Sequence, residues 1–191
     1  LNIDRPLVYM ADICRDRIRK GGETNYHIFI NSVEDIARII LGAGLTPDNT
    51  KVVCSSSEGR RERNEDKLPS GFTIGRAGDD PKTINFYTST CFEGQDIFDE
   101  VGETIIVSDA LKRQTMMDIS TSFIQIAGRI RNSRYKNRIT QIFSNSRYRR
   151  GISAEEYERE TLEKLDQVQK NIDWMNTCPK DLKKAFLKQV P

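Results

Sequence analysis

The sequence predicts an α/β domain with a mostly parallel central sheet covered by helices, followed by a helical extension. Short apolar runs, typical of buried strands, alternate along the chain with segments whose apolar residues recur at helical spacing. This alternation favours parallel strands joined by helices. A chain of 191 residues is long enough for one such domain and an appendage. We therefore expect a domain over residues 1–150 and a helical extension over residues 151–191.

The first helix is expected directly before the first strand. Asp4 can cap it, Pro6 suits its first turn, and Gly21 with Gly22 ends it. Its apolar positions recur at helical spacing: Leu7, Met10, Cys14 and Ile18. The apolar run over residues 26–30 (YHIFI) then predicts a buried strand.

A second helix should follow, because Ser32 and Asp35 have the spacing of an N-terminal capping pair. Its apolar face is formed by residues at helical spacing: Val33, Ile36 and Ile40. Gly42 and Gly44 are expected to end it. Residues 51–54 (KVVC) predict the next strand.

Residues 55–82 differ in composition from the segments around them. They are polar, rich in glycine and charge, and interrupted by Pro69 and Pro81, so we expect a long surface excursion with a short helix near residues 60–67. The elements expected after it are strands at 83–87 and 104–108, a helix at 116–130 and a final strand at 139–144.

The extension should be a single amphipathic helix. Ser153 and Glu156 form a capping box at its start. Its apolar residues share one side: Leu162, Leu165, Val168, Ile172 and Met175. We expect this side to pack on the domain or on a lobe outside this sequence.

The composition excludes several classes of protein. No run approaches the ~20 apolar residues of a membrane span, and no secretion signal is recognisable. The 4 cysteines are widely spaced and there is 1 histidine, which argues against a zinc site and favours reduced thiols in a cytoplasmic protein. The sequence begins without an initiator Met, so we interpret it as part of a longer protein.

The chain lacks the residues that hold nucleotide phosphates. No G-x-x-x-x-G-K-[ST] loop and no acidic D-E-x-x box are found in it. The glycine-rich stretch 71–78 has no Lys-Ser/Thr pair and is expected to be an ordinary loop. This chain is therefore not expected to hydrolyse ATP alone.

The most informative segment is 122–132 (SFIQIAGRIRN). Gln125, Gly128 and Arg129 have the spacing to share one side of a helix. A glutamine, a glycine that permits close approach and arginines with forked donors suit an anion arriving from outside. A solvated basic helix explains this segment alone equally well.

The Q-x-x-G-R pattern resembles motif VI of superfamily 2 helicases. The resemblance implies a RecA-like three-layer sandwich in which Arg129 is an arginine finger for ATP bound on another lobe. Gln125 would then lie at the nucleotide. Arg131 is predicted as the second finger, although the family pattern has that arginine where this chain has Asn132. The Q-x-x-G-R-x-R variant is most similar to helicases of the viral origin-binding type.

Residues 84–97 (INFYTSTCFEGQDI) resemble motif V of the same family, with five positions matching: Thr88, Ser89, Glu93, Gly94 and Asp96. The resemblance implies that Thr88 and Ser89 contact nucleic-acid phosphates, and that Gly94 and Asp96 lie beside the nucleotide. Hydroxyl donors after a strand lie where α/β sheets bind ligands. An ordinary capped turn would explain the segment taken alone.

Residues 27–32 (HIFINS) resemble motif IV, which makes Asn31 a candidate nucleic-acid contact. His27 is expected to be a strand-edge or core histidine rather than a catalyst, because no Asp or Cys partner is evident nearby. The resemblance as a whole extends over roughly residues 5–145 and does not include the C-terminal helix.

Residues 129–150 contain many Arg and Lys residues but no Asp or Glu. Such a stretch can bind a phosphate backbone, with Tyr135 and Tyr148 available for stacking on bases. Arg134 and Lys136 are therefore predicted to bind nucleic acid. For the arginines of 147–150, a solvated face fits as well.

The function expected from these features is that of the second lobe of an ATP-dependent helicase or translocase. ATP and Mg²⁺ would be bound mainly by an N-terminal RecA-like lobe absent from this sequence, and the nucleic acid would be DNA rather than RNA. A non-enzymatic nucleic-acid-binding module of the same fold is the main alternative. A dinucleotide-binding domain is less favoured, since no G-x-G-x-x-G turn follows the first strand.

Overall fold

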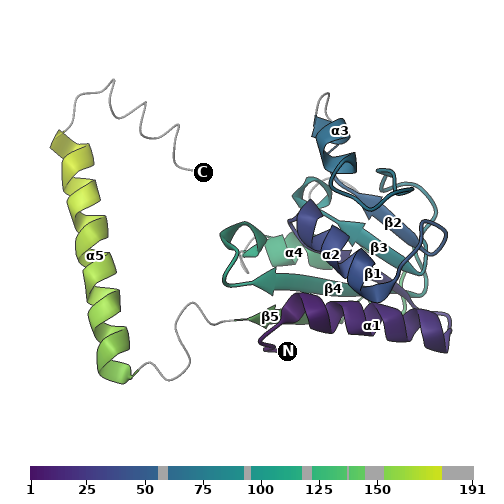
Figure 1. Ribbon diagram of the computed structural model, residues 1–191, viewed down its shortest axis with the longest axis horizontal. Helices are drawn as coiled ribbons and strands as arrows, with labels where there is room; N and C mark the ends of the chain where they lie inside the picture. The colour runs from purple at the N-terminus through teal and green to yellow at the C-terminus, as the bar shows by residue number, and fades with distance from the viewer. Residues whose placement is uncertain (56–59, 93–95, 118–121, 137, 145–152, 178–191) are drawn as a thin grey trace. The chain divides into compact units, whose positions relative to one another are not determined.

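The computed structural model describes residues 1–55, 60–92, 96–117, 122–136, 138–144 and 153–177 (Figure 1). Contacts between Cα atoms divide the chain into two compact units, Leu1–Arg147 and Tyr148–Pro191.

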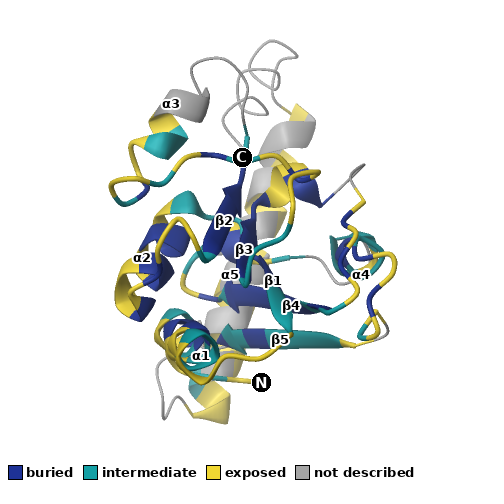
Figure 2. Ribbon diagram, turned by 90° about the vertical axis from the view of Figure 1, so that its right-hand side faces the viewer, coloured by how far each residue is buried: buried dark blue, intermediate teal, exposed yellow. Residues whose placement is uncertain are grey.

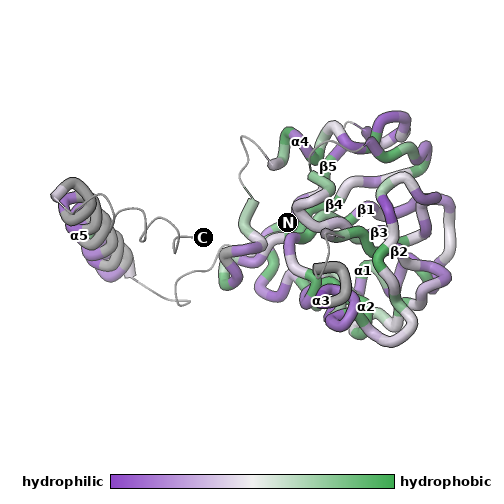
Figure 3. The backbone as a smooth tube through the Cα atoms, turned by 90° about the horizontal axis from the view of Figure 1, so that it is seen from above, coloured by the Kyte–Doolittle hydropathy of each residue, from purple (hydrophilic) through white to green (hydrophobic). Residues whose placement is uncertain are grey.

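The first unit is built on a sheet of five parallel strands in the order β2-β3-β1-β4-β5. The strands are β1 (Asn25–Phe29), β2 (Thr50–Val53), β3 (Ile84–Tyr87), β4 (Gly102–Asp109) and β5 (Ile139–Ser144). They coincide to within two residues with the apolar runs, so the predicted α/β class with a parallel sheet is confirmed. Hydrophobic segments gather at β2 and β3, whereas hydrophilic segments predominate along the outer loops (Figure 3).

Helices cover both faces of the sheet (Figure 2). On one face α1 (Pro6–Lys20) and α2 (Val33–Ala43) pack over a cluster that includes Ile28 and Phe86. On the other face α4 (Ile124–Ala127) contributes Ile126 to a second cluster with Phe29 and Tyr87. Successive residues of each strand point to opposite faces, which supplies both clusters from the same short strands. The result is a three-layer sandwich of RecA-like type.

The ends of α1 and α2 follow from local chemistry, with two corrections. Pro6 occupies the first turn of α1, and Gly21 follows its last residue, as predicted. The predicted cap at Asp4 is wrong, because Arg5 holds the N-cap position and makes no side-chain capping bond. The Ser32 side chain caps α2 by accepting the Asp35 backbone N–H. The prediction that Gly42 helps end α2 is wrong, because the helix continues to Gly44. A Cβ atom at Gly42 would lie 3.3 Å from the Ala11 Cβ, so glycine allows α2 to approach α1 closely.

The 55–82 excursion, expected at the surface, also contributes buried residues to the fold. It contains α3 (Arg60–Glu65), close to the helix predicted there. Beyond α3, Leu68, Ile74 and Ala77 are buried, and Ile74 forms a parallel bridge with Val52 of β2. The excursion thus covers the edge of the sheet at β2, where an exposed strand would offer unpaired backbone groups.

The helix predicted over 116–130 is wrong in extent. Residues 116–117 are not helical, and among the described residues of this segment the α-helical part is Ile124–Ala127, directly after the π-helical Ser122 and Phe123. A short 3₁₀ turn, η2 (Arg113–Thr115), precedes it instead. The Thr115 hydroxyl accepts the Asp109 backbone N–H and lies within hydrogen-bond distance of two carbonyls of the same turn, which favours a compact turn over a continuous helix.

The second unit contains α5 (Ala154–Thr177). Both bonds of the predicted capping box are present, since Glu156 N donates to Ser153 Oγ and Ser153 N donates to Glu156 Oε2. Of the predicted apolar side only Leu162 lies among the described side chains, and it is 58% exposed. None of the helices in the described ranges is long and apolar enough to cross a membrane.

Candidate functional site

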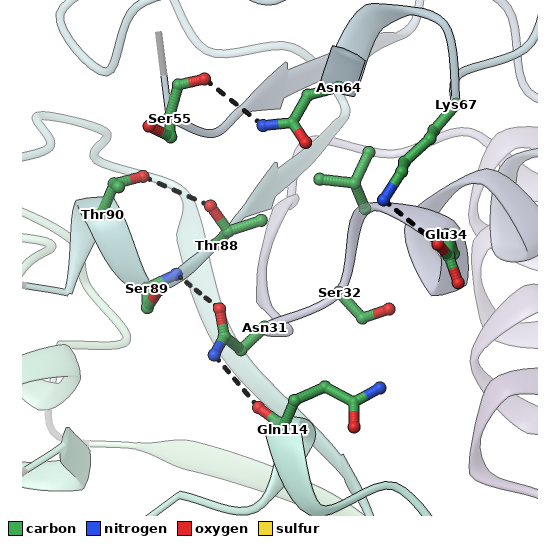
Figure 4. A pocket seen from close by; sticks show the side chains of 11 residues that line it. Asn31, Ser32, Glu34, Ser55, Asn64, Lys67, Thr88, Ser89, Thr90 and Gln114 are labelled. Atoms are coloured by element: carbon green, nitrogen blue, oxygen red, sulfur yellow. Dashed lines mark hydrogen bonds and ion pairs between the residues drawn. The ribbon is translucent and has the colours of Figure 1, made fainter. Parts of the chain in front are cut away.

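A polar hollow of about 300 Å³ opens where three strands of the sheet end (Figure 4). Asn31 follows β1, Ser55 follows β2, and Thr88 follows β3. The carboxyl edge of a parallel sheet is where ligands bind in open α/β folds. The other lining residues come from the start of α2, from α3 and the turn after it, and from the loops after β3 and β4: Ser32, Val33, Glu34, Asn64, Lys67, Ser89, Thr90 and Gln114.

Asn31 joins two of the loops around this hollow. Its Oδ1 accepts the Ser89 backbone N–H at 3.3 Å, and its Nδ2 donates to the Gln114 carbonyl at 3.0 Å. The side chain predicted to contact nucleic acid therefore fastens the turn after β3 to the loop after β4. This links the segments that resemble motifs IV and V in space.

Thr88 and Ser89 contribute hydroxyl groups to the same hollow. Thr88 is buried, and its Oγ1 lies 3.3 Å from Thr90 Oγ1. Ser89 is exposed and opens a 3₁₀ turn, η1 (Ser89–Cys91). Hydroxyls in this position can donate to phosphate oxygens, which is the role that the resemblance to motif V implies for these two residues.

The start of α2 gives the hollow a partial positive charge. The first N–H groups of a helix have no partner within it, and the helix dipole favours anions there. Glu34 opposes this charge, but its carboxylate lies 3.1 Å from Lys67 Nζ. The hydrogen bond from Lys67 lowers the pKa of Glu34 below its ordinary value. Lys67 is thus placed at the rim, paired with a competing carboxylate.

A second group of predicted residues meets on the opposite face of the sheet from α1 and α2. The segment after η1 and the segment after α4 form a parallel bridge between Ile97 and Ile130. Ile97 N donates to the Arg129 carbonyl at 2.8 Å, and Arg131 N donates to the Ile97 carbonyl at 3.0 Å. The residues that resemble motifs V and VI are therefore direct neighbours in the fold.

The arginines of this group are held by short polar contacts. Arg131 Nε donates to Asp96 Oδ1 at 2.8 Å, and both side chains remain about half exposed (51% and 43%). Arg129 follows the C-terminal end of α4 and its Nε donates to the Gln125 carbonyl at 2.9 Å. Both arginines are thus fixed beside Asp96 and Gln125. Gly94, predicted beside them, and Glu93 lie outside the described residues.

Arg134 and Lys136 lie at the side of the sheet where the strands begin, whereas Thr88 and Ser89 lie where a strand ends. Arg134 N donates to the carbonyl of Glu100, two residues before β4 begins. The Arg134 side chain pairs with Glu23 at 3.4 Å, just before β1. The fold therefore does not bring these basic residues together with the hollow. Of the remaining arginines of the basic stretch, Arg138 pairs with Glu103, and Arg147, Arg149 and Arg150 lie outside the described residues.

His27 has the partner that its sequence neighbourhood did not reveal. Its side chain is completely buried, with Nε2 at 2.8 Å from Asp99 Oδ2 and Nδ1 at 3.0 Å from the Tyr87 hydroxyl. Burial lowers the pKa of His27, although Asp99 acts in the opposite direction. Burial alone would raise the pKa of Asp99, but hydrogen bonds from His27, Asn25 and the Val101 N–H hold it below its ordinary value. No sequence signal joins residues 27 and 99, which meet only through strand pairing.

Three buried cysteines carry free thiols, as expected: Cys14, Cys54 and Cys91. Cys178 lies outside the described residues. Within the described ranges, no three His, Cys, Asp or Glu side chains are grouped so as to hold a metal ion.

Comparison with known proteins adds no assignment. No protein-family model matches the chain, and no curated protein matches it.

Proposed function

We propose that this chain is the second RecA-like lobe of a superfamily 2 nucleic-acid helicase or translocase. One observation carries the proposal: the segments that resemble motifs V and VI are bridged directly through Ile97 and Ile130, with Arg131 bonded to Asp96. The bridge brings two segments that are distant in sequence to one place in the fold, as a shared site requires. Their pairing supports a shared role for Asp96, Arg129 and Arg131.

The role we assign to Arg129 and Arg131 is to supply positive charge to phosphates held by another lobe. Guanidinium groups match phosphate oxygens geometrically, and an arginine placed at the transferring phosphate stabilises the charge of the transition state. This chain offers cations but no phosphate-binding loop. ATP and Mg²⁺ would therefore be held mainly by an N-terminal lobe, with Gln125 at the edge of that site.

The polar hollow is assigned to the nucleic-acid backbone. Hydroxyls of Thr88 and Ser89, together with the N-terminal turn of α2, form an array of donors without large apolar surfaces. Donors of this kind bind phosphates and carry no sequence information. In this proposal the polar hollow and the arginine segment lie on one lobe. Closure of this lobe on the N-terminal lobe then couples ATP turnover to binding of the nucleic-acid strand.

The test is Arg129→Ala in the complete protein that carries the N-terminal lobe. We expect ATP turnover to fall by about 1000-fold or more, because an arginine finger contributes on the order of 10³ to 10⁵ in kcat. Nucleic-acid affinity should stay unchanged, since Arg129 does not line the hollow. Arg19→Ala is the matched control, because Arg19 is an exposed arginine on α1 that pairs with Asp16. Unchanged turnover in Arg129→Ala would refute the assignment.

The non-enzymatic module is favoured by one observation. The described residues that line the hollow include no part of the arginine segment, so the hollow could bind a phosphate backbone without any nucleotide. The same experiment separates the two functions. A complete protein that binds nucleic acid but shows no ATP turnover, before and after the substitution, is a binding module.

A further inference from the structure

The segment that carries the two arginines is fastened to the start of β4 at successive positions. Asp99 N donates to Asn132 Oδ1 at 2.8 Å. Ser133 Oγ donates to the Gly102 carbonyl at 2.5 Å, and Arg134 N donates to the Glu100 carbonyl at 3.0 Å. With the bridge at Ile97, these bonds tie residues 129–134 to residues 96–102 along their whole length. The direction of the arginine segment therefore depends on where residues 96–102 are held.

Residues 96–102 are held through Asp99. Its carboxylate accepts hydrogen bonds from Asn25 Nδ2 at 2.9 Å and from Val101 N at 3.0 Å, in addition to its contact with His27 Nε2. A neutral His27 satisfies both of its partners with one tautomer, donating Nε2–H to Asp99 and accepting the Tyr87 hydroxyl at Nδ1. Asp99 is thus anchored in the buried core of the sheet, and its backbone reaches Asn132.

Gly102 lies directly against the pair formed by His27 and Asp99. A Cβ atom at position 102 would lie 2.8 Å from His27 Nε2 and 3.1 Å from the Asp99 Cβ. No side chain fits there without displacing the pair. Glycine at this position leaves room for His27 and Asp99 to meet.

The contact made by Asn132 accounts for the position of the second arginine, Arg131, which lies one residue earlier than in the family pattern. Its side-chain oxygen accepts the Asp99 N–H, and an arginine at 132 could not, because a guanidinium group has no acceptor. Position 132 is therefore used for attachment. The neighbouring Arg131 is directed to Asp96 instead.

We propose that His27 and Asp99 are positioning residues that hold the 129–131 segment at the surface where it receives a phosphate. The proposal rests on the proposed function for its catalytic consequence, and on the hydrogen bonds above for its structural one. It adds a core histidine and an aspartate, distant in sequence from the arginines, to the residues on which ATP turnover depends.

The first experiment measures ATP hydrolysis by the complete protein with saturating nucleic acid. Asp99→Ala should lower kcat by about 100-fold, the cost of a displacement of roughly 1 Å, while the KM for ATP changes by less than about twofold. His27→Leu should act in the same way. His27→Gln should restore most of the activity, because an amide keeps a donor for Asp99 and an acceptor for Tyr87.

A double-mutant cycle shows whether Asp99 acts through the arginine segment. In a background that carries both Arg129→Ala and Arg131→Ala, the effect of Asp99→Ala on kcat should shrink to about tenfold or less, because residues that act as a unit are not additive. The same 100-fold loss in both backgrounds would overturn the proposal. Met10→Ala is the stability control, since Met10 is fully buried on the opposite face of the sheet and its loss should leave kcat per folded molecule unchanged.

The second experiment needs no ATP turnover. NMR of the ¹⁵N-labelled 191-residue chain can follow the signal of the Arg131 Nε–H group, which donates to Asp96. Asp99→Ala should shift this signal towards that of an exposed arginine, whereas Met10→Ala should not. An unmoved signal overturns the proposal. Retained turnover in Arg129→Ala would instead refute the proposed function, and the NMR result would still decide the positioning role.

Discussion

Lowering the pH from 7 to 5 should destabilise this protein through its only histidine. His27 lies fully buried in β1, between Asp99 and Tyr87. Burial lowers the pKa of His27, the hydrogen bond and charge of Asp99 partly oppose this, and Lys51 adds to the lowering. The folded protein therefore takes up a proton on this ring at a lower pH than the unfolded chain.

The size of the effect follows from proton linkage. The unfolded chain protonates His27 near its ordinary pKa of 6.5, so the contribution to stability is complete above that pH. Each pH unit below it removes up to about 1.4 kcal/mol from the free energy of unfolding, or up to about 2 kcal/mol at pH 5. The loss ends when the pH reaches the lowered pKa of the folded state. Asp99 adds nothing in this window, because its contribution is lost only below the unfolded pKa of about 3.9.

The assay is urea unfolding followed by circular dichroism at pH 7, 6 and 5. The free energy of unfolding should fall with a slope that approaches the linkage value, while the dependence on urea stays constant. His27→Gln should flatten the slope, because an amide does not titrate. An equal free energy of unfolding at pH 5 and pH 7, or an unchanged slope in the variant, would show that His27 does not cause the pH dependence.

Two further predictions concern stability and are checked by the same unfolding assay. Lys112→Met should lower the free energy of unfolding by about 1–3 kcal/mol, because it removes one of two cations that, among the described residues, pair with the buried Asp35 carboxylate, and leaves Arg38. Adding Asp35→Asn should recover most of this loss, and no recovery would contradict the explanation. Ser153→Ala should reduce the helicity of α5, because a serine cap contributes about 1 kcal/mol, while Ser153→Asp should preserve it.

Some residues of the proposed site could be predicted from the sequence, and others could not. Thr88, Ser89 and Asn31 follow strands that the apolar runs predict, and the edge of a parallel sheet brings such ends together. The pairing of Arg131 with Asp96 could not be predicted, because it joins residues from two separate crossovers. Lys67 was not among the predicted site residues, since it comes from an excursion whose path the sequence does not specify.

The basic stretch illustrates the limit of reading charge from sequence. Residues 134 and 138 carry arginines in a segment without acidic residues, yet both pair with glutamates from other parts of the chain, Glu23 and Glu103. A run of charge along the sequence does not establish an uncompensated patch, because the facing strand and loop supply the counter-charges. Whether Arg134 and Lys136 bind nucleic acid stays a prediction.

The elements whose causes are local could be predicted from the amino-acid sequence. Strand-forming apolar runs, the Ser32 cap and the Ser153–Glu156 capping box all depend on residues within a few positions of one another. The contact of His27 with Asp99, and the bonds between residues 96–102 and the arginine segment, could be found only in the folded structure. Those contacts span long loops, and the strand order β2-β3-β1-β4-β5, which no local pattern encodes, is what brings their partners together.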